Sequence, residues 1–596
     1  MEKITLTIDQ IQVEVPKGTT VLEAARVAGV DIPSLCYLKD INAIGACRVC
    51  LVEVEGSRGL QASCVFPVAE GMVVKTNTKK LRDARKSTVE LILSNHNREC
   101  LTCSRNKNCE LQSLAEEMNI TEIPFEGDKS ETTIDAFSTS IVRDSSKCIL
   151  CGRCVNVCKN QQEIGILDFT NRGFETQVSP AFNMSMDQAP CIYCGQCIVA
   201  CPVAALKEKE DIDRVWDAIE DPDLHVVVQT APAVRAALGE EFGLPIGSRV
   251  TGKMVSALKR LGFSKVFDTN YAADLTIMEE GHELLHRLQN KGTLPMITSC
   301  SPGWVRYCEF NYPEFLPNLS TCKSPHQMLG AIVKSYYAEK NNVDPKKIFM
   351  VSIMPCTSKK SEVARPELEV NGLRDVDAVL TTRELAKMIK QARIDFLKLE
   401  DADFDSALGT YTGAGVIFGA TGGVMEAALR TVADVLEGKD LEQFEYNNIR
   451  GVEGIKEAEV TLGGNTIRIA IAHGTAQAAK LLEMVKNGER EYHFIEMMGC
   501  SGGCVAGGGQ PHVTAKQRME YDIRIERAKA LYEEDTKMEF RKSHKNPLIK
   551  ELYDTYLGKP NGHKAHELLH THYVEREQYP TSKEDSVVVE EQHKIS

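Results

Sequence analysis

The distribution of cysteine constrains this chain more than any other feature. Of its 21 cysteines, 15 lie before residue 202, in sets spaced like metal ligands. Thiols in such number indicate either disulfides or bound metal. The first ten residues lack the basic start and apolar core of a secretory signal, and no apolar run approaches the roughly 18 residues of a membrane span. We therefore expect a reducing cytoplasm, and metal clusters rather than disulfides.

The last two of four sets are the clearest. Each follows the pattern C-x2-C-x2-C-x3-C, which binds a pair of 4Fe-4S clusters, the fourth cysteine of each run ligating the other cluster. A structural zinc site would need only two pairs of cysteines, and two runs of four exceed that. The expected ligand sets are Cys148, Cys151, Cys154 and Cys201 for one cluster, and Cys191, Cys194, Cys197 and Cys158 for the other.

The first set lies in a segment whose pattern predicts a small ferredoxin-like, β-grasp fold. Residues 3–8, 11–15 and 51–56 have strand patterns, and residues 20–30 have a helix pattern. Four thiolates on such a scaffold indicate a 2Fe-2S cluster, although the spacing is not the plant-type C-x4-C-x2-C. The spacing resembles the amino-terminal domain of the large iron-sulfur subunit of respiratory complex I. The alternative is four buried structural cysteines. The residues concerned are Cys36, Cys47, Cys50 and Cys64.

The remaining set contains a histidine. His96, Cys100, Cys103 and Cys109 form H-x3-C-x2-C-x5-C. This pattern again resembles the complex I subunit and implies a 4Fe-4S cluster with one imidazole ligand, the alternative being an ordinary surface or core histidine. A neutral imidazole in place of a thiolate makes a cluster less negative, so its reduction potential should be higher than that of an all-cysteine cluster.

Beyond about residue 212 the pattern changes to alternating helices and apolar strands. Strands are predicted within 224–234, 294–304 and 347–356, and the last two end in Cys300 and Cys356. Such units favour α/β architecture with functional residues at the strand ends. The predicted class is therefore multidomain α+β and α/β, and the charged segment 207–214 is the expected hinge.

Three later segments carry a family resemblance. TSCSPGW (298–304), MPCTSKKSE (354–362) and EMMGCSGGCVAGG (496–508) resemble the signature segments TSCCPxW, MPCxxKxxE and ExMxCxxGCxxG of the [FeFe]-hydrogenases. The resemblance runs from about residue 3 to about residue 574. It implies reversible conversion of 2H+ and 2e- into H2 at a six-iron active cluster, which joins a cubane to a diiron unit with CO, cyanide and a bridging dithiolate.

The domains implied are a 2Fe-2S domain (1–78), a 4Fe-4S domain with one histidine and three cysteine ligands (79–125), a two-cluster domain (138–210), a catalytic domain (211–520), a helical, small-subunit-like segment (521–574) and a polar tail (575–596).

The resemblance also implies roles for individual residues. Cys356, Cys500 and Cys504 would ligate the cubane, with Cys504 bridging to the diiron unit. Lys359 would hold one cyanide by a charge-assisted hydrogen bond. The remaining diiron contacts would be the backbone near Ala231 and Pro232 and the apolar side chains of Met354, Phe418 and Met498. Methionine at such places is also ordinary core filling.

Protons would travel by a separate route. Cys300 matches the residue that exchanges protons with the active cluster, and Glu280, Ser320, Glu283 and Arg287 fall where the family's relay lies. Groups that exchange protons work best when their pKa values lie near the operating pH. Without the family resemblance, an exposed helix face would be the preferred interpretation of the two glutamates.

One position departs from the family pattern. Ser301 stands where the family has the fourth cubane ligand. Three interpretations follow. In the first, Ser301 ligates as an alkoxide, a harder donor that should lower the reduction potential of the cluster. In the second, Cys300 becomes the ligand and leaves the relay, and in the third the site is incomplete. In the last case the protein would be a non-catalytic hydrogen sensor, or an electron-transfer or cluster carrier. Cys308 and Cys322 fit no motif and are expected to be small buried hydrophobes.

Composition bears on the partners. The net charge is -14 and no basic patch is interleaved with aromatic residues, so nucleic acid is an unexpected partner. Segment 79–86 is basic and is either a docking surface for an acidic electron carrier or a solvated helix face. No G-x-G-x-x-G follows a strand. Expected partners are therefore ferredoxin, or NAD(P)H-oxidising flavin and thioredoxin-like subunits, together with hydrogenase maturation proteins.

Overall fold

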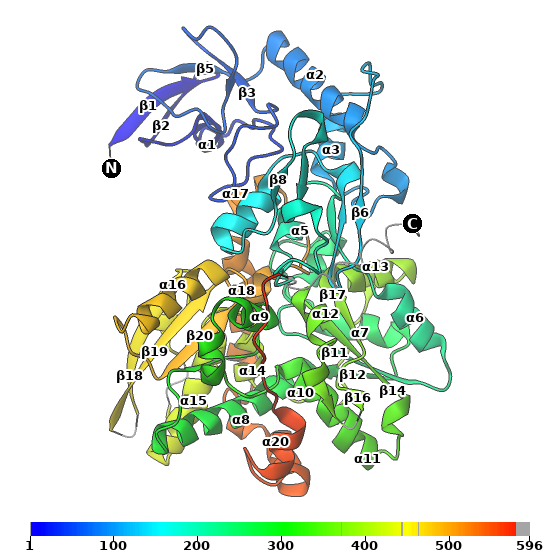
Figure 1. Cartoon of the computed structure of the whole chain (residues 1–596), viewed down its shortest axis with the longest axis vertical. Helices are drawn as coiled ribbons and strands as arrows, with labels where there is room; N and C mark the ends of the chain where they lie inside the picture. Colours follow the sequence, from blue (N-terminus) through cyan, green and yellow to red (C-terminus); the bar gives the residue numbers. More distant parts are fainter. Residues whose placement is uncertain (1, 371, 443–444, 463, 580–596) are drawn as a thin grey trace. The chain divides into compact units, whose positions relative to one another are not determined.

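The computed structural model describes residues 2–370, 372–442, 445–462 and 464–579 (Figure 1). The chain forms two compact units. Unit 1 comprises the described residues up to Ala189, with Gln196–Lys207 and His512–Tyr521, and unit 2 comprises Pro190–Gly195, Glu208–Pro511 and the described residues from Asp522 onward. The chain passes between the units at five places, one of them inside segment 207–214. In the described part of the chain, no helix combines the length and apolarity needed to cross a membrane.

Unit 1 begins with a five-stranded sheet in the order β2-β1-β5-β3-β4. Alternate residues of β1 are buried, as expected for a strand with one face on a core. The predicted strands at 3–8 and 11–15 and the helix within 20–30 are confirmed. Thr20 and Glu23 form a capping box that fixes the start of that helix. The bounds are β1 Lys3–Ile8, β2 Ile11–Pro16, α1 Val21–Val27, β3 Leu51–Val54, β4 Gln61–Ala62 and β5 Val73–Lys75.

The rest of unit 1 consists of short elements that frame cysteine loops. Helices α2 (Lys79–Asn95) and α3 (Glu110–Glu117) flank the histidine-containing set, and α4 (Arg153–Asn156) packs against α5 (Gln196–Ala200). Strands β6 (Ile134–Asp135) and β7 (Ile141–Asp144) pair antiparallel. The basic segment 79–86 forms the first half of α2, where most of its side chains are exposed. Its role in docking stays a prediction.

Unit 2 is built on two sheets. The first, β12-β11-β14-β17, is wholly parallel, and the second, β13-β20-β19-β18, is parallel except for β18. The α/β architecture is thereby confirmed. The strand predicted within 294–304 is shorter than expected, because Pro302 begins helix α9 (Pro302–Asn311). The strands are β11 His225–Thr230, β12 Lys265–Asp268, β13 Met296–Ile297, β14 Ile348–Met354, β17 Ala378–Thr381, β18 Ile455–Leu462, β19 Asn465–His473 and β20 Phe494–Met498.

Helix α8 (Thr269–Gln289) is central to unit 2. Its residues Tyr271 and Leu275 belong to the core of the first sheet, whereas Ile277 and Leu284 belong to the core of the second. Most of its polar side chains are therefore buried too. Around it pack α10 (Pro325–Ile332), α14 (Gly413–Ile417), α15 (Gly423–Glu437) and α19 (Pro547–Leu552).

The carboxy-terminal segment is helical, as predicted. Helices α18 (Ile523–Lys537), α19 and α20 (His563–Leu569) belong to unit 2, and α20 packs against α10. Figure 1 shows α20 in red near α8. Of the predicted polar tail, residues 580–596 lie outside the described residues.

Candidate functional site

Two strands of unit 2 end in the predicted ligand loops. Cys356 follows β14, Cys500 follows β20, and Cys504 begins a 3-10 turn (Cys504–Ala506) in the same loop as Cys500. Burial, then the charge of Cys356, raises the pKa of Cys504 to about 12. A half-buried thiol with a pKa this high stays protonated unless a bound cation supplies the compensating charge. The arrangement therefore fits thiolate ligation of a metal cluster.

Ser301 belongs to the same loop cluster. Its hydroxyl oxygen accepts a hydrogen bond of 3.1 Å from the backbone N–H of Gly499, the residue before Cys500. Although Ser301 precedes α9, it makes no cap hydrogen bond to that helix. A Cβ added at Gly499 would lie 3.2 Å from the Ser301 oxygen, so the close approach favours glycine. The serine side chain is thus directed at the cysteine loop and not at its own helix.

Lys359 connects this loop to a buried ionic network. Its Nζ donates to the carbonyl oxygen of Cys300 at 3.2 Å and to Glu362 at 2.9 Å. Glu362 also bonds His326, whose pKa falls to about 4 because of burial and the nearby Lys359 charge. Sequence reasoning did not single out Glu362, although it is the last letter of the MPCTSKKSE segment. Glu362 fixes the position of Lys359.

The predicted packing residues are all buried. Phe418 and Met498 share one apolar cluster, against which Cys300 packs. Ala231 and Met354 belong to the core of the first sheet, and Pro232 is buried beside Ala231. The two sheets thus each contribute apolar side chains from a strand end. Contact of these residues with a diiron unit stays a prediction.

The predicted relay residues lie on the buried part of α8 and on the loop before α10. Glu280 is 2% exposed and Glu283 is 9% exposed, so the alternative of an exposed helix face is wrong. Burial, then the negative charge of Glu283, raises the pKa of Glu280 to about 8. Glu283 accepts hydrogen bonds from Ser320 at 3.1 Å and from Arg287 at 2.6 Å. Burial, then the charge of Glu280, raises the pKa of Cys300 well above its ordinary value.

The two cysteines without a motif are buried, as predicted. Cys322 is nevertheless not surrounded only by apolar groups. Its Sγ lies 3.9 Å from Oε2 of Glu283, so it borders the predicted relay residues.

In unit 1, the four cysteines of the first set converge. All are buried, the backbone N–H of Cys36 donates to Sγ of Cys47 at 3.4 Å, and Cys64 lies within hydrogen-bond reach of both Cys36 and Cys50. Four separately buried structural cysteines would not need to share one point. The geometry fits a four-thiolate cluster.

His96 has the surroundings of a metal ligand. It is 8% exposed, and among the described residues its Nδ1 has no hydrogen-bond partner. Burial, then the charge of Lys147, lowers its pKa to about 4. A neutral imidazole with a buried, unpaired nitrogen is costly unless that nitrogen is bonded, and a metal ion can bond it. The pKa of Cys109 is raised mainly by burial and also by the charge of the nearby Cys103.

Of the two ligand sets expected from the four-cysteine runs, one lies wholly within unit 1. Cys148, Cys151, Cys154 and Cys201 line one small cavity of unit 1. Burial raises the pKa of Cys148 to about 11 and that of Cys151 to about 12. In the other set, Cys158 and Cys197 belong to unit 1 whereas Cys191 and Cys194 belong to unit 2. Their grouping stays a prediction.

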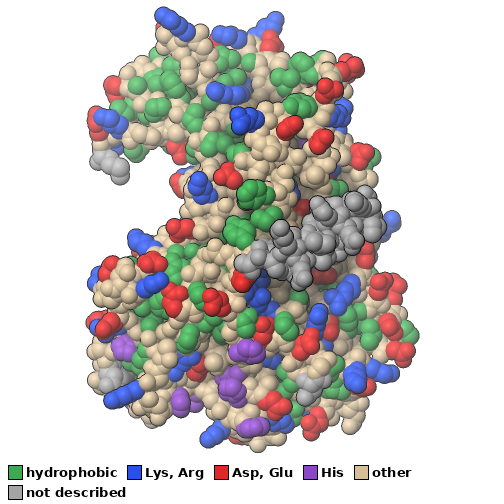
Figure 2. All heavy atoms as spheres, viewed as in Figure 1, with side chains coloured by type: hydrophobic (Ala, Val, Ile, Leu, Met, Phe, Trp, Pro, Cys, Tyr) green, Lys and Arg blue, Asp and Glu red, His purple; other side chains and the backbone are tan. Residues whose placement is uncertain are grey.

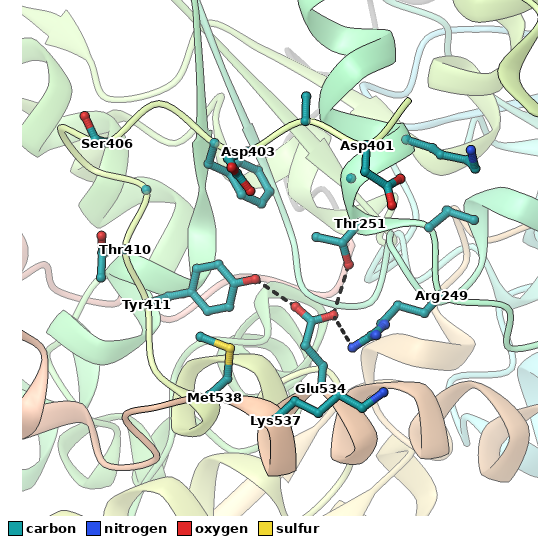
Figure 3. A pocket seen from close by; sticks show the side chains of 16 residues that line it. Arg249, Thr251, Asp401, Asp403, Ser406, Thr410, Tyr411, Glu534, Lys537 and Met538 are labelled. Carbon is teal, nitrogen blue, oxygen red and sulfur yellow. Dashed lines mark hydrogen bonds and ion pairs between the residues drawn. The ribbon is translucent and has the colours of Figure 1, made fainter. Parts of the chain in front are cut away.

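A separate surface pocket of about 690 Å³ lies in unit 2, and no predicted site residue lines it. Figure 3 shows Tyr411, Thr251 and Arg249 converging on Glu534 there. Glu534 also receives a hydrogen bond of 2.8 Å from the buried Arg235. These partners hold the carboxylate in a structural network.

Family models match five stretches of the chain. The iron only hydrogenase large subunit, C-terminal domain, matches residues 224–508, and the iron hydrogenase small subunit matches residues 521–576. Upstream, a 2Fe-2S iron-sulfur cluster binding domain matches residues 1–79. The NADH-ubiquinone oxidoreductase-G iron-sulfur binding region matches residues 85–124, and a 4Fe-4S dicluster domain matches residues 147–205.

Similarity to known proteins extends over nearly the whole chain. NADP-reducing hydrogenase subunit HndD of Solidesulfovibrio fructosivorans is 49% identical, covering 97% of this chain and 100% of that protein. Iron hydrogenase 1 of Clostridium pasteurianum is 47% identical, covering 96% of this chain and 99% of that protein. A solved structure of apo [FeFe]-hydrogenase HydA1 from Chlamydomonas reinhardtii matches with a TM-score of 0.56 and 45% identity, covering 62% of this chain and 99% of that one.

The cysteine-rich domains and the cysteine-bearing loop cluster of unit 2 define an iron-sulfur oxidoreductase. More particularly, the chain belongs to the iron-only, or [FeFe]-, hydrogenases. It combines 2Fe-2S and 4Fe-4S domains with the hydrogenase active-cluster domain of that family.

Proposed function

We propose that unit 2 interconverts protons and H2 at a six-iron cluster held by Cys356, Cys500, Cys504 and Ser301. The observation that carries this proposal is the arrangement of the loops after β14 and β20, where Cys356 lies near enough to Cys504 to raise its pKa and Ser301 lies beside the Cys500 loop. When bound, the cluster supplies the two-electron chemistry. The protein orients it, excludes water and moves protons.

Two observations favour Ser301 as the fourth ligand of the cubane. Its oxygen points to the Cys500 loop, where the Gly499 N–H would stabilise a charged oxygen by hydrogen bonding. Cys300 instead packs against the apolar cluster of Phe418, and after burial its pKa is raised first by the charge of Glu280 and then by that of Cys504, so it lies between the predicted relay and the ligand loop. Cys300 therefore stays at the inner end of the relay.

Three variants test this assignment by EPR of the matured protein. Cys300→Ala should keep the six-iron signal but slow turnover by about 100-fold or more, because a positioned proton donor is lost. Ser301→Ala should lose that signal, and Ser301→Cys should keep it at a higher reduction potential because a softer donor replaces the alkoxide. Loss of the signal in Cys300→Ala, with retention in Ser301→Ala, would assign the ligand to Cys300 instead.

Lys359 is proposed to bind an anionic ligand of the diiron unit. Its charge is held in place by Glu362 and by the carbonyl oxygen of Cys300. An ammonium group fixed in a buried site binds an anion without reorganising. Ala231, Pro232, Met354, Phe418 and Met498 are proposed to pack around the same unit.

Protons are proposed to move between Cys300 and Glu283 through Glu280 and Ser320. The pKa of Glu280, about 8, lies near neutral pH, which suits a group that gains and loses protons during turnover.

Electrons are proposed to enter through one 2Fe-2S and three 4Fe-4S clusters in the ligand sets given above. For the donor, the similarity to an NADP-reducing hydrogenase subunit favours an NAD(P)H-oxidising partner with flavin and thioredoxin-like subunits, and ferredoxin is the alternative. The glycine-bearing segment 418–427 runs from α14 into α15 and not from a strand, so it does not form a dinucleotide-binding turn. H2 production from NADPH or NADH by the purified chain alone would contradict this assignment.

The second candidate function is a cluster carrier, which Ser301 alone favours. The cytosolic Fe-S cluster assembly factor narfl of Danio rerio is 33% identical over 58% of this chain. Reduced methyl viologen distinguishes the two functions. Matured, fully iron-loaded protein should evolve H2, and its failure to do so would favour the carrier.

A further inference from the structure

The outer end of the proposed relay is occupied by a side chain that cannot exchange protons. Arg287 donates to Glu283 at 2.6 Å and to backbone carbonyls, including that of Leu319 at 2.8 Å. A guanidinium group stays charged throughout the physiological pH range. Arg287 can therefore hold the charge of Glu283, but another group has to pass the proton on.

Glu283 has a second neighbour that can do so. The hydroxyl of Thr321 donates to Oε2 of Glu283 at 3.3 Å, and the same hydroxyl lies 2.7 Å from Nδ1 of His570. Backbone bonds hold these two residues opposite each other, because Thr571 N–H donates to the carbonyl of Thr321 at 2.8 Å and Lys323 N–H to that of Leu569 at 2.8 Å. The contact joins the loop before α10 to the segment after α20.

His570 sits at the boundary between this network and the surface. It is 7% exposed, and the ring of His566 stacks on it with centroids 4.5 Å apart. His566 is itself exposed. Figure 2 shows histidine side chains gathered on the part of the surface where Figure 1 places α20 and α8. An imidazole is the side chain whose ordinary pKa suits proton exchange near neutral pH.

We propose that Thr321 and His570 form the outer branch of the proton relay, an inference that rests on the proposed function. In the outward direction the proton of the Glu283 carboxyl passes to Oγ1 of Thr321, while the Thr321 hydroxyl proton passes to Nδ1 of His570. The products are a carboxylate and an imidazolium. No electron is transferred, and the inward direction reverses both steps.

The charged groups around His570 support this step. Its Nε2 lies 3.0 Å from the buried carboxylate of Glu279, which stabilises an imidazolium. Glu279 is held in turn by Tyr553 and by the backbone N–H of Asn561 at 2.8 Å. The other titratable neighbours are Glu283, Cys322 and His566. Burial, then the charge of His570, lowers the pKa of His566, so the stacked pair favours one proton over two.

Two pairs of variants test the branch. Thr321→Val removes the hydroxyl at nearly constant shape, whereas Thr321→Ser keeps it. His570→Gln cannot carry the proton, and His282→Gln is its control, since His282 lies on α8 but bonds the carbonyl of Met278. The first readout is the rate at which the Glu280 carboxyl exchanges with D2O, followed by infrared spectroscopy in the full chain before the diiron unit is inserted. The second is H2 turnover of the matured chain.

Thr321→Val and His570→Gln should slow the exchange and lower H2 turnover by about ten-fold, with a larger solvent isotope effect and an unchanged KM for the electron donor. This value lies below the ~100-fold or more expected for a single essential acid-base group, since water at the partly exposed Thr321 offers another route. Thr321→Ser and His282→Gln should behave like the wild type. If His570→Gln does not fold, the Thr321 pair decides alone.

Unchanged exchange and turnover in Thr321→Val would overturn the branch while leaving the proposed function intact. An inactive wild type after maturation would overturn the proposed function, and the exchange measurement would still decide the branch.

Discussion

Replacing Glu280 with glutamine tests whether Glu280 is a buried proton carrier or a structural carboxylate. Burial and the Glu283 charge raise the pKa of Glu280 from 4.5 to about 8. That difference corresponds to ~5 kcal/mol against the charged form. At pH 7 the protonated form should therefore outnumber the carboxylate by about ten to one.

The sign of the pH dependence follows from this raised value. Below pH 4.5 the carboxyl is protonated in both the folded and the unfolded chain, so it adds no pH dependence to the free energy of unfolding. Between about pH 4.5 and pH 8 the unfolded chain ionises and the folded chain does not, so stability falls by ~1.4 kcal/mol per pH unit. Glu280→Gln removes that slope, and its unfolding free energy should exceed that of the wild type by ~3 kcal/mol at pH 7.

The assay is infrared titration of the neutral carboxyl band in the full chain. A band with a midpoint near pH 8 should be present in the wild type and absent in Glu280→Gln. Asp274→Asn is the control, because Asp274 is a buried carboxyl with a pKa of about 6 that bonds Thr412 and Asn546 outside the relay. In matured protein, Glu280→Gln should lower H2 turnover by about 100-fold or more. A midpoint below about pH 6, or wild-type turnover in Glu280→Gln, would refute the reasoning.

Three further predictions concern other parts of the chain. His96→Cys should lower the reduction potential of its cluster in redox-titrated EPR, because a thiolate adds negative charge; an unchanged potential would exclude His96 as a ligand. Gly423→Ala should prevent unit 2 from folding, as judged by limited proteolysis, since a Cβ would meet the carbonyl oxygen of Ile417 in sterically impossible contact. Arg430→Met should cost about 1.5–3 kcal/mol in denaturant unfolding, because the buried carboxylate of Asp535 loses two charge-assisted hydrogen bonds of 2.9 Å and keeps those from Arg541. Full stability in either variant would contradict the packing described.

Much of the metal chemistry was predictable because its signals are local. The short spacings within 148–154, within 191–197 and within His96–Cys109 are those expected of loops that each wrap one cluster, so the signal survives in the sequence alone. The buried strands before Cys356 and Cys300 were likewise visible as apolar runs. Only the length of β13 was wrong, because the helix start at Pro302 follows it so closely.

The sequence carries no such local signal for the predicted relay or for the fourth ligand. The segment MEEGHELLHRL fits an exposed helix, and Glu280 is buried only because the elements around α8 cover its polar side chains. The contacts on which both proposals rest join distant segments: Gly499 lies 198 residues from Ser301, and His570 lies 249 residues from Thr321.

The sequence by itself therefore predicted which residues bind iron, since ligand type and spacing are properties of short loops. Tertiary structure placed the Ser301 oxygen beside the Cys500 loop and decided which carboxyls are buried deeply enough to have raised pKa values. Those outcomes depend on burial and on electrostatic contacts between elements remote in the chain, and no local pattern of residues specifies them.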